Sequence, residues 1–172
     1  KSILIISSDH GHMFEHGYLM HPPPLMYEPL FHIPLLIHLP GQKDSVKVKA
    51  LAEQVDIMPT ILDLLSKSIP PWMEGESLVP YMKNPVLESD KTKYSMVLSL
   101  EKVEQEGVAG WFSAYWKEYK LIYHMYTDSA RLFKVMNEQQ VETNLSGKES
   151  EVFWKLKRDL NKKIDINYRN IS

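Results

Sequence analysis

Ile3-Leu4-Ile5-Ile6-Ser7-Ser8-Asp9-His10-Gly11 is the stretch that decides the fold prediction, because an apolar run ends there in an acid and a histidine. The branched isoleucines predict a buried strand over residues 2–8, and the glycines, prolines and histidines that follow predict a loop over 9–24. Open α/β sheets bind their ligands just beyond the carboxyl ends of their strands. We therefore expect an α/β sheet domain in which Asp9 and His10 lie together at the C-terminal end of a parallel strand.

A carboxylate beside an imidazole predicts a metal site. Carboxylate oxygen suits hard divalent cations, and imidazole suits zinc, manganese and similar ions. Neighbouring side chains of a strand point to opposite faces, but they can converge where the chain turns at the strand end. In the alternative reading, Asp9 caps the following turn and His10 packs beside it. Two ligands do not complete a site, so the remaining ligands would come from elsewhere.

The loop holds three further histidines, His12, His16 and His21, of the seven in the chain. A loop histidine is typically a surface or turn residue, but clustered imidazoles can also donate to an anionic substrate oxygen. Trp111 and Trp116 are interpreted as sheet-face residues rather than as a sugar platform.

The rest of the chain divides into two predicted parts. Residues 1–86 continue the α/β domain with a strand over 33–39 and a helix that Asp56 can cap and that has Pro59 in its first turn. Residues 93–172 predict a small antiparallel sheet packed with a C-terminal helix. The expected strands of this second part are 94–100, 110–115, 119–125 and 132–135, and the expected helix is 149–164.

Composition excludes some classes of protein. A net charge of −2 gives no electrostatic case for nucleic acid or an anionic membrane surface. The chain has no cysteine, which excludes disulfides and thiolate metal sites, and no apolar run approaches the length of a transmembrane segment. The chain starts directly with a strand, so we expect further sequence upstream, and the compartment stays open between secreted, periplasmic and cytoplasmic.

The order of the motifs is more specific than any one of them. The series closely resembles the C-terminal half of the sulfatase family, within the alkaline phosphatase superfamily. After the opening stretch it consists of Glu15-His16-Gly17-Tyr18, His21-Pro22-Pro23, Leu25-Met26-Tyr27-Glu28, His32-Ile33-Pro34-Leu35-Leu36-Ile37, Pro40-Gly41, Val55-Asp56-Ile57-Met58-Pro59-Thr60-Ile61-Leu62-Asp63-Leu64 and Gly75-Glu76-Ser77-Leu78.

The resemblance implies metal-dependent hydrolysis of sulfate esters. Asp9 matches an acidic metal ligand of the family, and His10 matches the neighbouring ligand position. Calcium is the expected cation, with manganese or zinc as alternatives. His21 falls where many members carry a lysine that touches the substrate, so we expect it to be catalytic.

The family's other aspartate ligands and its nucleophile lie upstream of the matching region. We therefore expect the upstream half of the catalytic domain as a partner, no activity from the isolated segment, and an exposed apolar edge at its first strand. One alternative is a phosphate or phosphonate ester hydrolase of the same superfamily. Another is a non-catalytic fragment that serves binding or assembly. The sequence leaves the oligomeric state unassigned.

Overall fold

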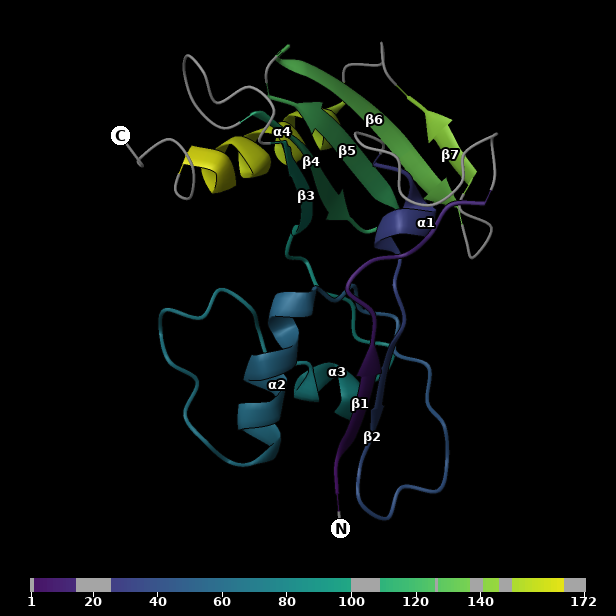
Figure 1. Ribbon diagram of the computed structural model, residues 1–172, viewed down its shortest axis with the longest axis vertical. Helices are drawn as coiled ribbons and strands as arrows, with labels where there is room; N and C mark the ends of the chain where they lie inside the picture. Colours follow the sequence, from purple (N-terminus) through teal and green to yellow (C-terminus); the bar gives the residue numbers. More distant parts are fainter. Residues whose placement is uncertain are drawn as a thin grey trace. The chain divides into compact units, whose positions relative to one another are not determined.

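The computed structural model describes residues 2–14, 26–99, 109–125, 127–136, 141–145 and 150–165 (Figure 1). Chain contacts group the residues into two compact units, one made of 1–41 with 94–172 and the other of 42–93. These units are defined by contacts within the chain, whereas the sequence predicts domains over residues 1–86 and 93–172. The predicted domain division stays a prediction. No helix in the described ranges is long and apolar enough to cross a membrane.

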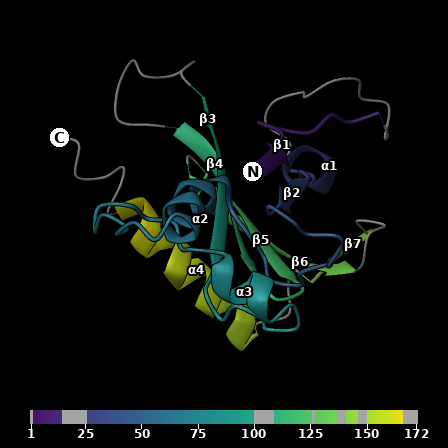
Figure 2. The same cartoon turned by 90° about the horizontal axis from the view of Figure 1, so that it is seen from below.

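The first unit is built around a five-stranded sheet. Its strands follow one another in sequence order, and the hairpins from β4 to β7 are antiparallel. Figures 1 and 2 show α4 along one side of this sheet and α1 on the other. The strands are β3 (Lys93–Ser99), β4 (Ala109–Trp116), β5 (Tyr119–His124), β6 (Ser129–Met136) and β7 (Val141–Asn144), and the helices are α1 (Glu28–Phe31) and α4 (Glu151–Ile164).

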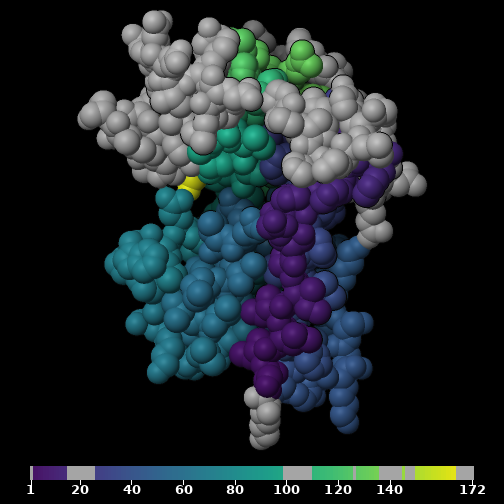
Figure 3. Space-filling model, in the orientation of Figure 1, coloured from purple at the N-terminus to yellow at the C-terminus, as the bar shows by residue number. Residues whose placement is uncertain are grey.

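The opening stretch forms a second, two-stranded sheet in the same unit. β1 (Leu4–Ser7) pairs with β2 (Leu35–His38) in antiparallel register, and no other described strand pairs with β1. The expected parallel neighbour is therefore absent from the described residues. The prediction of a fully buried strand is also wrong, because Leu4 and Ile6 are 54% and 51% exposed. Figure 3 shows this strand, in purple, at the surface. This position agrees with the exposed apolar edge that the resemblance leads us to expect at the first strand.

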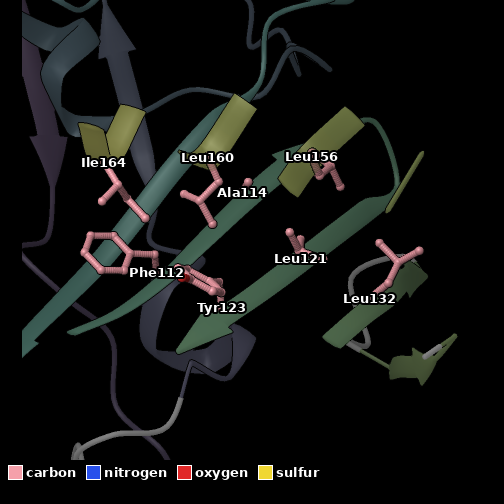
Figure 4. Close-up of a cluster of buried hydrophobic side chains, with 8 residues drawn as sticks. All are labelled: Phe112, Ala114, Leu121, Tyr123, Leu132, Leu156, Leu160 and Ile164. Atoms are coloured by element: carbon pink, nitrogen blue, oxygen red, sulfur yellow. The ribbon is translucent and has the colours of Figure 1, made fainter. Parts of the chain in front are cut away.

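The core of the first unit lies between the five-stranded sheet and α4. Because side chains alternate along a strand, Leu121 and Tyr123 face α4 while Lys120 and Ile122 face the other side. Ser150 accepts a hydrogen bond from the Phe153 N–H and so caps the helix. The buried core side chains are Phe112, Ala114, Leu121, Tyr123, Leu132, Leu156, Leu160 and Ile164 (Figure 4). The predicted sheet packed with a C-terminal helix is confirmed.

The second unit joins short helices through the motif around Asp56. It contains a 3₁₀ helix (Gln54–Asp56), α2 (Ile57–Leu64) and α3 (Val79–Lys83). The buried Thr60 hydroxyl accepts a 2.9 Å hydrogen bond from the Leu78 N–H, which ties the start of α3 to α2. Thus the motif over residues 55–64 and the motif over residues 75–78 are joined in one unit, although they are separate in sequence.

Asp56 was expected to cap α2, and this expectation is wrong. Its side chain instead accepts from the N–H of Glu53, at 2.9 Å, and from the N–H of Glu76, at 2.8 Å. It also receives the Lys93 ammonium at 2.8 Å, and that ammonium reaches the Glu76 carboxylate at 2.9 Å. Gly75 is required nearby, because a Cβ there would lie 2.0 Å from the Val55 carbonyl oxygen.

We predict that this ion cluster makes stability depend on pH at both extremes. Burial by itself would raise the pKa of Glu76, but hydrogen bonds from Lys91 and Lys93 outweigh burial and hold it below the ordinary 4.5. Burial would lower the pKa of Lys93, but Asp56 and Glu76 outweigh burial and hold it above the ordinary 10.5. The contribution of Glu76 is therefore lost as the pH falls below about 4.5 through its folded value, and that of Lys93 as the pH rises above about 10.5.

Urea unfolding across a pH series measures this dependence. The wild-type chain should have a larger free energy of unfolding than the Glu76→Gln variant at neutral pH. This difference should disappear as the pH falls on the acid side. A constant difference between the two proteins down to the lowest pH at which both fold would contradict the assignment.

Candidate functional site

Asp9 and His10 converge on one side of the chain just after β1. The Asp9 Oδ2 and the His10 Nε2 are 3.7 Å apart, and both side chains are solvent-accessible. The strand ends at Ser7, so the backbone is free to turn and the opposed directions of strand neighbours no longer apply. The sequence prediction that these two side chains lie together is confirmed.

Asp9 is held as a carboxylate. Its Oδ1 accepts a 2.9 Å hydrogen bond from the backbone N–H of His10. This bond, with the nearby His10 ring and the Ser8 hydroxyl, holds the pKa of Asp9 below its ordinary value. An anionic oxygen therefore faces solvent at neutral and mildly acidic pH.

The ring of His10 is oriented by its own backbone neighbour. Its Nδ1 lies 2.9 Å from the carbonyl oxygen of Gly11, and a carbonyl only accepts, so Nδ1 carries the proton. In that tautomer the lone pair is on Nε2, the nitrogen nearest Asp9. Histidines that ligate metals typically donate their other ring N–H to a carbonyl or carboxylate in this way.

These two side chains fit part of a divalent-cation site. Together they supply one anionic oxygen and one imidazole nitrogen, the donor types that calcium, manganese and zinc accept in differing proportions. Within the described ranges, no group of three or more histidine, cysteine, aspartate or glutamate side chains is gathered closely enough to hold a cation. The described part of the chain therefore offers two candidate donors, fewer than the four to eight ligands that such ions take.

Of the other three loop histidines, the structure describes only His12. The ring of His12 lies 5.5 Å from that of His10 and 6.1 Å from that of Phe14, which is a packing arrangement. His16 and His21 lie outside the described residues, so the expected substrate contact of His21 stays a prediction.

The segment that bears the two candidate ligands rests on α1. The N–H of Gly11 donates a 2.9 Å hydrogen bond to the carbonyl of Leu30. A Cβ at position 11 would lie 1.9 Å from the carbonyl oxygen of Pro29, so only glycine permits this approach of the two backbones. The placement of Asp9 and His10 therefore depends on α1.

Sequence reasoning missed one pair of side chains that holds α1. Glu28 stands in one of the motifs and Lys120 in the strand expected over 119–125, but no sequence pattern joins the two. In the structure, the Lys120 Nζ lies 2.8 Å from the Glu28 Oε1, with side chains 0% and 6% exposed. The available signal was the lysine itself, because it occupies a strand of otherwise apolar character and lysine is rarely buried without a partner.

Comparisons with known proteins agree with the motif order. The family model for the C-terminal region of N-sulphoglucosamine sulphohydrolase matches residues 15–167. Arylsulfatase K of Mus musculus is 31% identical over 188 aligned positions, which cover all of this chain and 31% of that protein. An ulvan-active sulfatase of Formosa agariphila is 33% identical over 94 positions, covering 53% of this chain and 18% of that protein.

Solved structures share the fold. BT4656, in complex with its substrate D-glucosamine-2-N,6-O-disulfate, has a TM-score of 0.72 at 24% identity over 95% of this chain and 34% of its own. A phosphonate monoester hydrolase from Silicibacter pomeroyi has a TM-score of 0.72 at 23% identity over 96% and 35%. The expected fold class, the C-terminal part of an alkaline-phosphatase-like α/β domain with its small sheet and helix, is confirmed.

The chain spans about a third of the length of arylsulfatase K and of the two solved structures. The family model covers most of its residues, from the histidine-rich loop to the end of α4. The chain therefore belongs to the sulfatase family, as the order of its motifs predicts.

Proposed function

We propose that this chain is part of a metal-dependent sulfatase and supplies two ligands of its divalent cation, Asp9 and His10. One observation carries the proposal: the Asp9 Oδ2 and the His10 Nε2 lie 3.7 Å apart at the end of a strand, in a chain that belongs to the sulfatase family. Family membership supports sulfate ester hydrolysis in general. The named relatives favour a sulfated sugar as the substrate, because one binds a disulfated glucosamine and another acts on ulvan.

Each residue has a distinct proposed role. Asp9 offers an ionised oxygen to the cation, and His10 offers the Nε2 lone pair that the Gly11 carbonyl orients. His21 donates to an anionic oxygen of the substrate. A cation bound at this site would polarise the ester and stabilise negative charge that develops on its oxygens. Calcium is the proposed ion, and the imidazole keeps manganese and zinc as alternatives.

The test is a substrate comparison with the whole protein that contains this chain. We expect kcat/KM to be higher for an aryl sulfate than for the matched aryl phosphate or phosphonate monoester. A chelator should abolish turnover and added cation should restore it. The isolated 172-residue chain should give no turnover, because the upstream ligands and nucleophile are expected to be missing from it.

Three outcomes would contradict parts of this proposal. Preference for a phosphonate monoester would favour the second candidate function, which the fold of the Silicibacter pomeroyi hydrolase supports equally well. Turnover by the isolated chain that Asp9→Ala abolishes would show that no upstream residues are needed. No turnover of any ester by the folded whole protein would favour a binding or assembly role.

A further inference from the structure

We infer that Lys120 and Glu28 are positioning residues for the Asp9–His10 segment. Through their buried ion pair, β5 of the five-stranded sheet holds α1 in the position that the segment requires. This inference deepens the proposed function with respect to the cation. It assigns to the C-terminal sheet a role in the site, although the sheet itself supplies neither candidate ligand.

The first step of the argument is the attachment of α1 to the sheet. The Lys120 ammonium contacts the Glu28 carboxylate at 2.8 Å and donates a hydrogen bond to the carbonyl of Met26. It also lies 5.4 Å from the centre of the Tyr115 ring. These contacts fix the entry to α1 on the sheet. Figures 1 and 2 show α1 on the sheet face opposite to α4.

The second step is the cost of breaking the attachment. The Glu28 Oε1 is buried and accepts no hydrogen bond of normal geometry from the described residues. Without the Lys120 ammonium, the buried Oε1 would lose the cation that lies beside it, a state that a protein relieves by protonating the carboxylate or by exposing it to water. Hydration of Glu28 requires α1 to move away from β5.

The third step links α1 to the candidate ligands. The Leu30 carbonyl accepts the hydrogen bond from the Gly11 N–H, and the backbones of Gly11 and Pro29 are in direct contact. The carbonyl of Gly11 in turn orients the ring of His10. Movement of α1 therefore removes the support of the residue that adjoins both Asp9 and His10.

Lys120→Met, made in the whole protein, tests the inference with two readouts. The amide of Gly11 should exchange with solvent about 10-fold faster, because its acceptor on α1 is displaced. The affinity for manganese, measured by calorimetry, should fall about 10-fold, as is typical when the support of a metal ligand is lost. Unchanged exchange and affinity in a folded Lys120→Met protein would overturn the inference.

Two control variants separate positioning from stability. Lys134→Met removes a half-exposed ion pair with Glu118 from the same sheet and should leave both readouts unchanged. Lys93→Met removes a buried ion pair from the second unit and should lower stability without changing manganese affinity. If both controls altered the affinity as much as Lys120→Met, a general loss of stability would explain the result and the inference would fail.

Glu28→Gln keeps the test decisive if Lys120→Met does not fold. The variant retains the shape of the side chain and removes the negative charge that Lys120 contacts, so both readouts should change in the same direction. Unchanged readouts would again overturn the inference. The failure of the proposed function is distinguishable: if Asp9→Asn left manganese binding intact, the cation role would fail, while Gly11 exchange would still report on positioning.

Discussion

Replacing Asp9 by asparagine in the whole protein is expected to weaken divalent-cation binding by at least about 100-fold, the upper limit of what the loss of supporting residues costs. Asparagine keeps the size of the side chain, and its carbonyl oxygen can still accept the hydrogen bond from the His10 N–H. Only the negative charge is removed, and hard cations depend on that charge. Hydrolysis of the sulfate ester should decrease as well, because less cation is bound. Titration calorimetry with calcium and manganese gives the affinities directly.

Asp44→Asn is the matched control for this prediction. Asp44 is also an exposed aspartate of a turn-like segment, but it lies in the second unit. Its replacement should leave cation affinity and turnover at the wild-type level. An Asp9→Asn protein that bound calcium and manganese as tightly as the wild type would refute the assignment of Asp9 as a ligand.

A large loss of stability is expected from Lys93→Met. The Lys93 ammonium lies 2.8 Å from the Asp56 carboxylate, which is almost fully buried, and 2.9 Å from that of Glu76. Removing one partner of a buried ion pair leaves an uncompensated charge, which typically costs about 3–5 kcal/mol. We expect the free energy of unfolding to fall by that amount. Urea unfolding at neutral pH measures the change.

Lys91→Met provides the comparison for Lys93. The Lys91 ammonium also pairs with Glu76, at 2.7 Å, but its side chain is mostly exposed. An exposed pair contributes less than about 1 kcal/mol, so this variant should be close to the wild type. In the double variant Asp56→Asn/Lys93→Met, the loss should be smaller than the sum of the single losses, because the buried Asp56 charge that Lys93 compensates is removed together with it. Additive losses would contradict the ion-pair explanation.

The elements with a regular pattern could be predicted from the sequence. Leu156, Leu160 and Ile164 recur at four-residue spacing and lie on the buried face of α4. The pairing of Asp9 with His10 was also predictable, because it needs only two neighbouring residues and the end of a strand. The strand β7 was missed, since the short polar run over 141–145 resembles a turn.

The interactions that could not be predicted join distant parts of the chain. Asp56 is 37 residues from Lys93, and Lys120 is 94 residues from the carbonyl of Met26. Local propensity carries no information about such partners. The composition of β1 alone predicts burial, because an apolar run indicates the tendency to be buried and does not identify what covers it. Its exposed edge could be expected only from the resemblance, which places the rest of the catalytic domain upstream.

The central claim is that Asp9 and His10 bind a divalent cation in a sulfatase. The most direct measurement is a crystal structure of the whole protein grown with manganese, with an anomalous difference map to locate the ion. We expect a peak at about 2.0–2.6 Å from both an Asp9 carboxylate oxygen and the His10 Nε2. A manganese ion bound at other residues, with neither side chain as a ligand, would contradict the claim.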